Sequence, residues 1–165
     1  MIATAERSEL PPRAWRVIGA LAIVGGWALA WPAHATLGGV YSSVESDRTH
    51  MVARMRSASA ATYAVHTLTL PNQGEVREFT RSDGIVFAVA WKGPGRPDLR
   101  QLLGQQHFDT FQADNVPPQG RRTRRPLGVN RPDLIVHSAG HSGAFWGFAY
   151  LPQQTPSGFS TSELK

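Results

Sequence analysis

The sequence predicts an α+β domain in which an antiparallel sheet of about five strands carries two helices packed on one face. Two segments place apolar residues at helical spacing, and several short segments are rich in β-branched and aromatic residues. Turns that contain glycine or proline separate these segments. The predicted order of helix, three strands, helix and two strands is typical of this class.

Residues 1–35 have the organisation of a secretory signal peptide. Three arginines precede an uncharged run from Val17 to Ala30, and Ala33-His34-Ala35 then offers the small residues that a signal peptidase requires. The roughly 14 apolar residues fall short of the ~20 that a membrane-spanning helix needs, which disfavours a membrane anchor. We expect cleavage before Thr36 and a periplasmic or secreted protein with no stable membrane insertion afterwards.

Residues 36–152 are expected to form a single domain, and residues 153–165 a disordered tail. The chain contains no cysteine, which excludes disulfides, thiolate metal sites and a lipid-bearing cysteine at the mature N-terminus. The formal net charge is +5, and nearly all of the positive charge is arginine.

The first helix is expected from Ser42 to about Ser57. Ser42 and Glu45 have the spacing of a capping box, and apolar residues between Val44 and Met55 recur at helical intervals. Small residues follow and end the pattern.

Three strands are expected next. The segments 62–70 and 75–80 flank the turn Pro-Asn-Gln-Gly and predict a hairpin. Residues 85–91 are apolar on both faces, which predicts a central strand flanked by the strand of Arg77 and by one of the two late strands.

Pro97 and Asp98 predict the start of a second helix, which Gly104 bends or splits. Four apolar side chains should face the sheet: Leu99, Leu102, Leu103 and Phe111. Residues near 114–131 lose the apolar periodicity and predict an exposed Arg-rich loop. Segments 133–138 and 144–151 predict two further strands joined by a short glycine-rich turn.

Four blocks of the chain, in order, resemble a known family. They are ATLGG at 35–39, YAVHTLTLPNQGEVREF at 63–79, GIVFAVAWKGPGRPDLRQLLG at 84–104 and DLIVHSAGHSGAFWGFAYLP at 133–152. The family that they resemble is an exported-protein family of unknown function, domain of unknown function 2844. The resemblance implies export and a single domain, and it implies no activity, ligand or catalytic residue.

The sharpest charge feature is a group of four arginines that could grip phosphates or carboxylates through bidentate hydrogen bonds: Arg121, Arg122, Arg124 and Arg125. We hypothesise an anion-binding segment whose partner is an anionic envelope component or an acidic protein. Nucleic acid is the wrong partner for an exported protein. A solvated loop without a partner is the alternative.

His137, His141 and Ser142 are the candidate residues for chemistry. Gly140 to Ala144 resembles the nucleophile elbow G-x-S-x-G in part, but the last glycine is replaced by alanine. A triad could use Asp133, and a zinc or copper site could add His66. Surface or hydrogen-bonded structural histidines are the simpler interpretation, so we expect no catalytic residue, metal or cofactor.

Aromatic residues gather in the late strands and could line a ligand groove: Trp91, Phe145, Trp146, Phe148 and Tyr150. The simpler expectation is that the large face of the last strand packs beneath the helices. These observations favour a non-catalytic binding or accessory module of the bacterial envelope. A small hydrolase or metal-binding protein that uses His137, His141 and Ser142 is the alternative.

Overall fold

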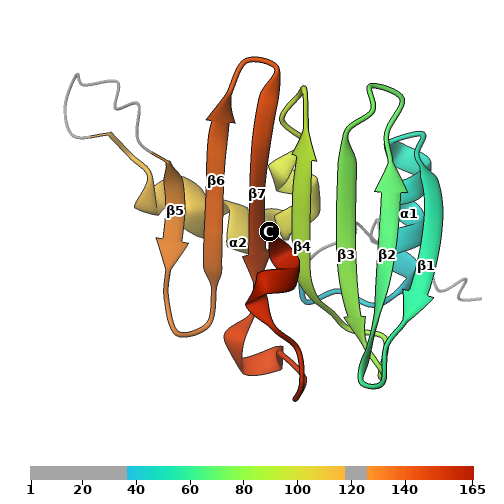
Figure 1. Cartoon of the computed structure of the whole chain (residues 1–165). Helices are drawn as coiled ribbons and strands as arrows, with labels where there is room; N and C mark the ends of the chain where they lie inside the picture. Colours follow the sequence, from blue (N-terminus) through green and yellow to red (C-terminus); the bar gives the residue numbers. More distant parts are fainter. Residues whose placement is uncertain (1–36, 118–125) are drawn as a thin grey trace, which may run out of the picture. The chain divides into compact units, whose positions relative to one another are not determined.

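A computed structural model describes residues 37–117 and 126–165, all within one compact unit, Trp31–Lys165. Its centre is an antiparallel sheet of seven strands in the order β1-β2-β3-β4-β7-β6-β5 (Figure 1). The strands are β1 Arg54–Ser59, β2 Tyr63–Thr69, β3 Glu75–Arg81, β4 Val86–Gly93, β5 Leu127–Asn130, β6 Ile135–His141 and β7 Ala144–Tyr150. The α+β class is confirmed, and the predicted number of about five strands is too low.

Different segments cover the two faces of the sheet. Helices α1 (Ser42–His50) and α2 (Leu99–Asp114) lie on one face, which we call the helix side. The C-terminal segment, with the short 3-10 helices η1 (Pro152–Gln154) and η2 (Thr161–Leu164), crosses the other face, the tail side (Figure 1). Each covering layer seals its own apolar cluster against the sheet.

The first helix begins at Ser42 as predicted but ends at His50, and the segment from Arg54 onward is a strand. Val52 adopts φ +52° and is 77% exposed, so the chain turns there instead of continuing the helix. The apolar spacing up to Met55 fits a helix, but it also fits a turn followed by an edge strand. Pairing with β2 satisfies the backbone of β1, which decides between the two.

The predicted capping box does not form at the start of α1. Tyr41 occupies the N-cap position without a side-chain cap bond, and Ser42 already lies inside the helix. Glu45 instead accepts a hydrogen bond of 2.7 Å from Arg48 Nε, one helical turn later. Glu45 therefore forms an i,i+3 ion pair with Arg48 and no reciprocal cap with Ser42.

The predicted hairpin and central strand are confirmed. β2 and β3 pair over their full lengths, and β4 lies between β3 and β7. Residues Val86–Trp91 of β4 are all at most 3% exposed, because the helices cover one face of the strand and the tail covers the other. β4 therefore connects the two halves of the sheet.

Helix α2 has the predicted start, because the Asp98 carboxylate accepts hydrogen bonds from the backbone N–H groups of Arg100 and Gln101. Gly104, with φ +73°, kinks the helix as expected. The four leucine and phenylalanine side chains expected to face the sheet are all buried.

The segment near 114–131, which was predicted to be an exposed loop, contains the strand β5. This strand forms one edge of the sheet. Asn115 holds it in place: its side chain accepts from the Gly128 N–H at 3.0 Å and donates to the Gly128 carbonyl at 3.1 Å. Arg131 adds an ion pair of 2.7 Å to Asp114 at the end of α2. These long-range contacts, and not the local sequence pattern, make the strand.

The C-terminal residues, predicted to be disordered, pack on the tail side of the sheet. Leu164 is 3% exposed, and Phe159 contacts the rings of Tyr63, Phe79 and Phe87 edge to face at 4.9–5.5 Å between centroids. The tail is polar in sequence, but its few apolar residues meet aromatic side chains of β2, β3 and β4. Contacts between distant parts of the sequence therefore order it.

Candidate ligand-binding site

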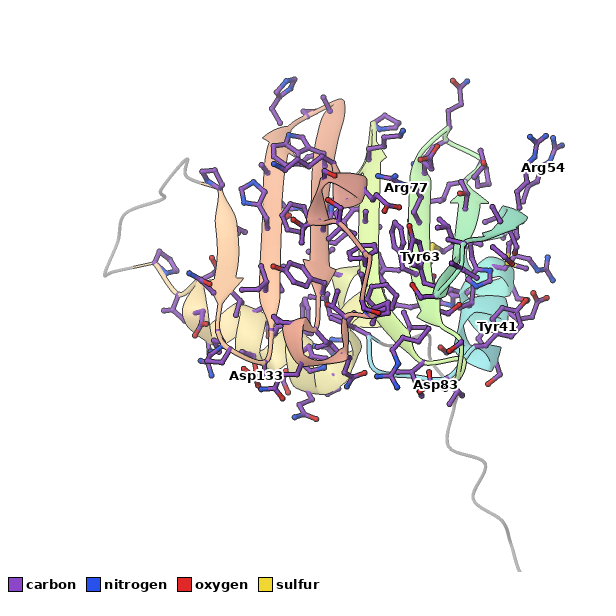
Figure 2. All side chains as sticks on the ribbon, turned by 60° about the horizontal axis from the view of Figure 1, so that its bottom comes forward. Tyr41, Arg54, Tyr63, Arg77, Asp83 and Asp133 are labelled. Carbon is purple, nitrogen blue, oxygen red and sulfur yellow. The ribbon has the colours of Figure 1, made fainter. Side chains whose placement is uncertain are left out.

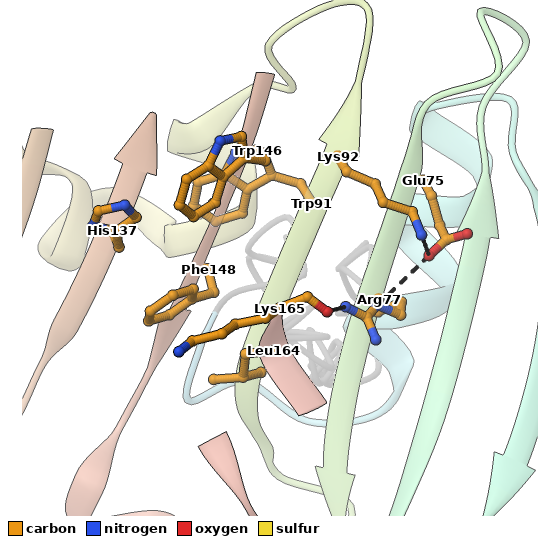
Figure 3. Close-up of a pocket in the computed structure, with 10 residues that line it drawn as sticks. Glu75, Arg77, Trp91, Lys92, His137, Trp146, Phe148, Leu164 and Lys165 are labelled. Carbon is orange, nitrogen blue, oxygen red and sulfur yellow. Dashed lines mark hydrogen bonds and ion pairs between the residues drawn. The ribbon is translucent and has the colours of Figure 1, made fainter. Parts of the chain in front are cut away.

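A pocket of about 660 Å³ lies on the tail side, between the end of the C-terminal segment and the strands β3, β4, β7 and β6 (Figure 3). We call it the tail-side pocket. Ten residues line it: Glu75, Arg77, Trp91, Lys92, His137, Trp146, Gly147, Phe148, Leu164 and Lys165.

Strand alternation places most of these side chains on the tail side, whereas Trp91 alternates to the helix side, where its ring lies against Gly147. In the antiparallel register Lys92 lies opposite Glu75 on one neighbour and opposite Trp146 on the other. Two residues along β4, the small Ala90 lies between Arg77 and Phe148. Ala90 is buried in the tail-side cluster that contains Leu164, so the end of the tail packs over this part of β4 beside the pocket.

Three rings pack against one another at the β7–β6 side of the pocket. The His137 imidazole lies 4.8 Å from Trp146 and 5.6 Å from Phe148 between ring centroids, with interplanar angles of 35° and 24°. Trp146 is 46% exposed, although an indole is usually well buried. We refer to His137, Trp146 and Phe148 as the aromatic shelf.

Charged groups line the opposite wall. Glu75 Oε1 lies 3.2 Å from Lys92 Nζ and 3.6 Å from Arg77 Nε. Arg77 also donates to the main-chain oxygens of Glu163 at 2.9 Å and of Lys165 at 3.3 Å. Arg77 thereby joins the strand wall to the end of the tail (Figure 3).

A second anchor holds the tail beside the pocket. The Tyr63 hydroxyl on β2 donates to the Glu163 carboxylate at 2.7 Å, and this hydrogen bond raises the pKa of the phenol. Figure 2 shows that the Tyr63 and Arg77 side chains are both on the sheet face that the tail crosses. Because Leu164 is also buried against β3 and β4, the tail is a fixed wall of the pocket.

The family model described as "Protein of unknown function (DUF2844)" matches residues 33–164 of the chain. The chain belongs to this family. The match includes all the strands that carry the tail-side pocket and ends one residue before Lys165. No curated protein and no solved structure matches the chain in the same comparisons.

The four arginines of the hypothesised anion-binding segment, Arg121, Arg122, Arg124 and Arg125, lie outside the described residues. Their binding role stays a prediction. The signal peptide predicted at residues 1–35 also lies outside the described part of the chain. Within that part, no helix is long and apolar enough to cross a membrane.

The structure does not bring the residues of the predicted hydrolase or metal site together. Asp133 precedes β6 and Ser142 follows it, so seven strand residues, roughly 20 Å, separate them. Figure 2 shows Asp133 at the end of the sheet opposite the β6–β7 turn. His141 Nδ1 lies 3.0 Å from the Ser142 carbonyl oxygen in that turn, an exposed local contact.

The three histidines also separate. His66 points to the helix side, where its ring nitrogens lie 2.8 Å from Ser57 Oγ and 2.9 Å from Thr80 Oγ1, and its burial lowers its pKa. His137 is on the tail side. Among residues 37–117 and 126–165, no three His, Cys, Asp or Glu side chains are grouped as metal ligands would be.

The expectation that the large face of β7 packs beneath the helices is wrong. Phe148 and Tyr150 pack on the tail-side cluster, whereas Ala149 of the small face belongs to the helix-side core. Gly147 explains the arrangement: a Cβ atom there would collide with the ring of Trp91, which occupies the helix-side space over β7. The small face of β7 therefore makes room for Trp91, and the large face is left for the tail side.

Four residues of the pocket were candidates from the sequence: His137, Trp91, Trp146 and Phe148. The charged residues of the opposite wall, Glu75, Arg77 and Lys92, were not. Alternation in β3 already places Glu75 and Arg77 on one face, opposite the apolar Val76. Lys165 and Leu164 carried no such signal, because the sequence does not indicate that the tail folds back on the sheet.

Proposed function

We propose that this chain is an exported, non-catalytic binding module of the bacterial envelope, and that its ligand occupies the tail-side pocket. The half-exposed Trp146, set beside His137 and Phe148 on a rigid sheet, is the observation that carries the proposal. Ligand sites are typically concave, mostly apolar and equipped with a few polar groups, as this pocket is. Leaving an indole exposed costs hydrophobic free energy that a bound ligand would recover.

The chemistry of the pocket supports binding over catalysis. Glu75, the carboxylate on its wall, is held between Lys92 and Arg77 instead of facing a nucleophile. His137 contacts aromatic rings, and none of the described residues provides it with a carboxylate to orient it as a general base. These groups can attract and orient a ligand without reacting with it.

A fragment screen followed by NMR tests this proposal without assuming the ligand's charge. The indole N–H signal of Trp146 is assigned by its absence from the Trp146→Ala variant. We expect some fragments to shift this signal saturably, and we expect Trp146→Ala to abolish their binding. Tyr41→Ala removes another half-exposed aromatic ring, beside α1, and should leave binding unchanged. A diverse library that never shifts the Trp146 signal would refute the proposal.

A further inference from the structure

The charged side chains of the tail-side pocket determine which sign of charge its ligand can carry. Three cationic side chains, Arg77, Lys92 and Lys165, line the pocket together with one acidic side chain, Glu75. Aromatic sites for cationic ligands rely on the negative faces of the rings without competing cations nearby. Here a cationic ligand would meet an excess of positive charge, so the pocket favours an anion.

The three cationic side chains differ in the ion pairs and hydrogen bonds that they already make within the protein. Arg77 is committed to Glu75 and to two main-chain oxygens of the tail, and Lys92 is paired with Glu75. Among the described residues, the Lys165 ammonium group has no ion-pair partner. Figure 3 shows its side chain extending toward the Phe148 side of the pocket. Lys165 is therefore the cation best placed to pair with a ligand, with the 64%-exposed side chain of Lys92 next.

The aromatic shelf restricts the shape of the ligand. The imidazole of His137 lies within 24–35° of parallel to both neighbouring rings at centroid separations of 4.8 and 5.6 Å, so it packs against their faces, and the 46%-exposed indole of Trp146 offers the open ring surface of this group. Planar rings stack on such a surface with offset geometry, which stabilises the contact beyond the burial of apolar area. Leu164 supplies an apolar edge beside the shelf.

We infer that the tail-side pocket binds a planar organic anion, an aromatic ring system that carries a carboxylate or a similar acidic group. The ring would stack on Trp146, and the acidic group would pair with Lys165, with Lys92 as a second cation in reach. This inference rests on the proposed binding function and adds the class of ligand to it.

Three probes that share one ring system and differ in charge test the inference: 2-naphthoate, the neutral 2-naphthalenemethanol and the cationic 2-naphthylmethylamine. Each is titrated into the protein purified after expression of the full chain, with the Trp146 indole signal as the readout. We expect the dissociation constant of naphthoate to be at least tenfold lower than that of the alcohol. The amine should bind most weakly, and added salt should reduce the preference for naphthoate.

Lys165→Gln is the informative variant, because the main-chain oxygen of residue 165 remains available to Arg77 and the tail stays anchored. We expect it to weaken naphthoate binding about tenfold and to leave binding of the alcohol unchanged. Arg54→Gln removes an exposed cation of the edge strand β1, far from the pocket (Figure 2), and is the matched control that should change neither. An unchanged thermal melting temperature verifies that both variants are folded.

The outcomes separate the two proposals. If the alcohol or the amine binds as tightly as naphthoate and shifts the Trp146 signal, the pocket is a binding site but the anionic ligand class is wrong. If Lys165→Gln retains the full preference for naphthoate, the assignment of Lys165 is wrong. If no naphthalene probe and no library fragment shifts the Trp146 signal, the binding function itself is overturned.

Discussion

Two carboxyl groups are buried on the helix side of the sheet. Asp47 of α1 and Glu78 of β3 are both 0% exposed, and Asp47 accepts a hydrogen bond from the side-chain amide of Gln101 in α2. Burial, together with the charge of Asp47 and a hydrogen bond to it, raises the pKa of Glu78 well above its usual value. Glu78 is therefore the carboxyl of the pair that holds its proton to higher pH, and the pair links both helices to the sheet.

This arrangement predicts a stability that falls as the pH rises. Because the pKa of Glu78 is higher in the folded than in the unfolded state, its contribution is complete below about pH 4.5. That contribution is lost as the pH rises through the folded-state pKa, at about 1.4 kcal/mol per pH unit between the two values. Glu78→Gln keeps an amide donor for Asp47 without the titration, so we expect its free energy of unfolding to lose this decline.

Urea unfolding of the wild type and of Glu78→Gln between pH 4 and pH 8 measures the effect. The difference between the two proteins removes the contribution of His66, whose lowered pKa acts in the opposite direction. Asp109→Asn, which replaces an exposed carboxyl on α2, is the control and should keep the wild-type profile. Parallel curves for the wild type and Glu78→Gln would contradict the protonated-acid assignment.

At the scale of elements, β1 and the C-terminal tail are the segments whose structure differs most from the prediction. β1 is an edge strand with mostly exposed side chains, held through pairing with β2. The tail is held by Leu164, by Phe159 and by hydrogen bonds from Tyr63 and Arg77. Neither segment has a strong local propensity, and each takes its shape from the sheet beside it.

Phe159→Ala tests the packing of the tail. The ring contacts three aromatic side chains, so its removal should destabilise the protein by about 3 kcal/mol, within the range for large core truncations. Ser157→Ala, at an exposed position of the same segment, should change stability by less than about 0.5 kcal/mol. Chemical denaturation checks both variants, and equal stability of Phe159→Ala and the wild type would mean that the tail does not pack on the sheet.

At the scale of the whole molecule, the two faces of the sheet differ in what covers them. Two helices pack on one face, and the tail covers only part of the other. Helices α1 and α2 bury the helix side, while the shorter tail covers β2, β3 and β4 and leaves part of β7 and β6 open. The tail-side pocket lies where the covered part of this face meets the open part. Its position therefore follows from the path of the tail as much as from the strands.

The export of the protein is a prediction at this scale. Because the charged, apolar and small-residue regions of residues 1–35 agree, we expect the exported protein to begin at Thr36. N-terminal sequencing or intact-mass measurement of protein from the periplasm and the medium checks it. A protein that retains Met1 and sediments with membranes would show that the segment is an anchor.

The sequence by itself determined the elements that depend on neighbouring residues. The Asp98 cap, the bend at Gly104, the β2–β3 hairpin and the doubly buried β4 all follow from local periodicity and turn chemistry. The family blocks were likewise readable without a structure.

Only the tertiary structure decided the edge strands, the folded tail and the pocket. β1 and β5 are strands because a neighbouring strand completes their hydrogen bonds, and the tail is ordered because aromatic rings distant in sequence receive Phe159. The site combines Glu75 with Trp146 and Lys165, residues separated by tens of positions that the register of β3, β4 and β7 and the path of the tail place together. A single sequence records which side chains a strand presents, but the pairing order of the strands determines which of them meet.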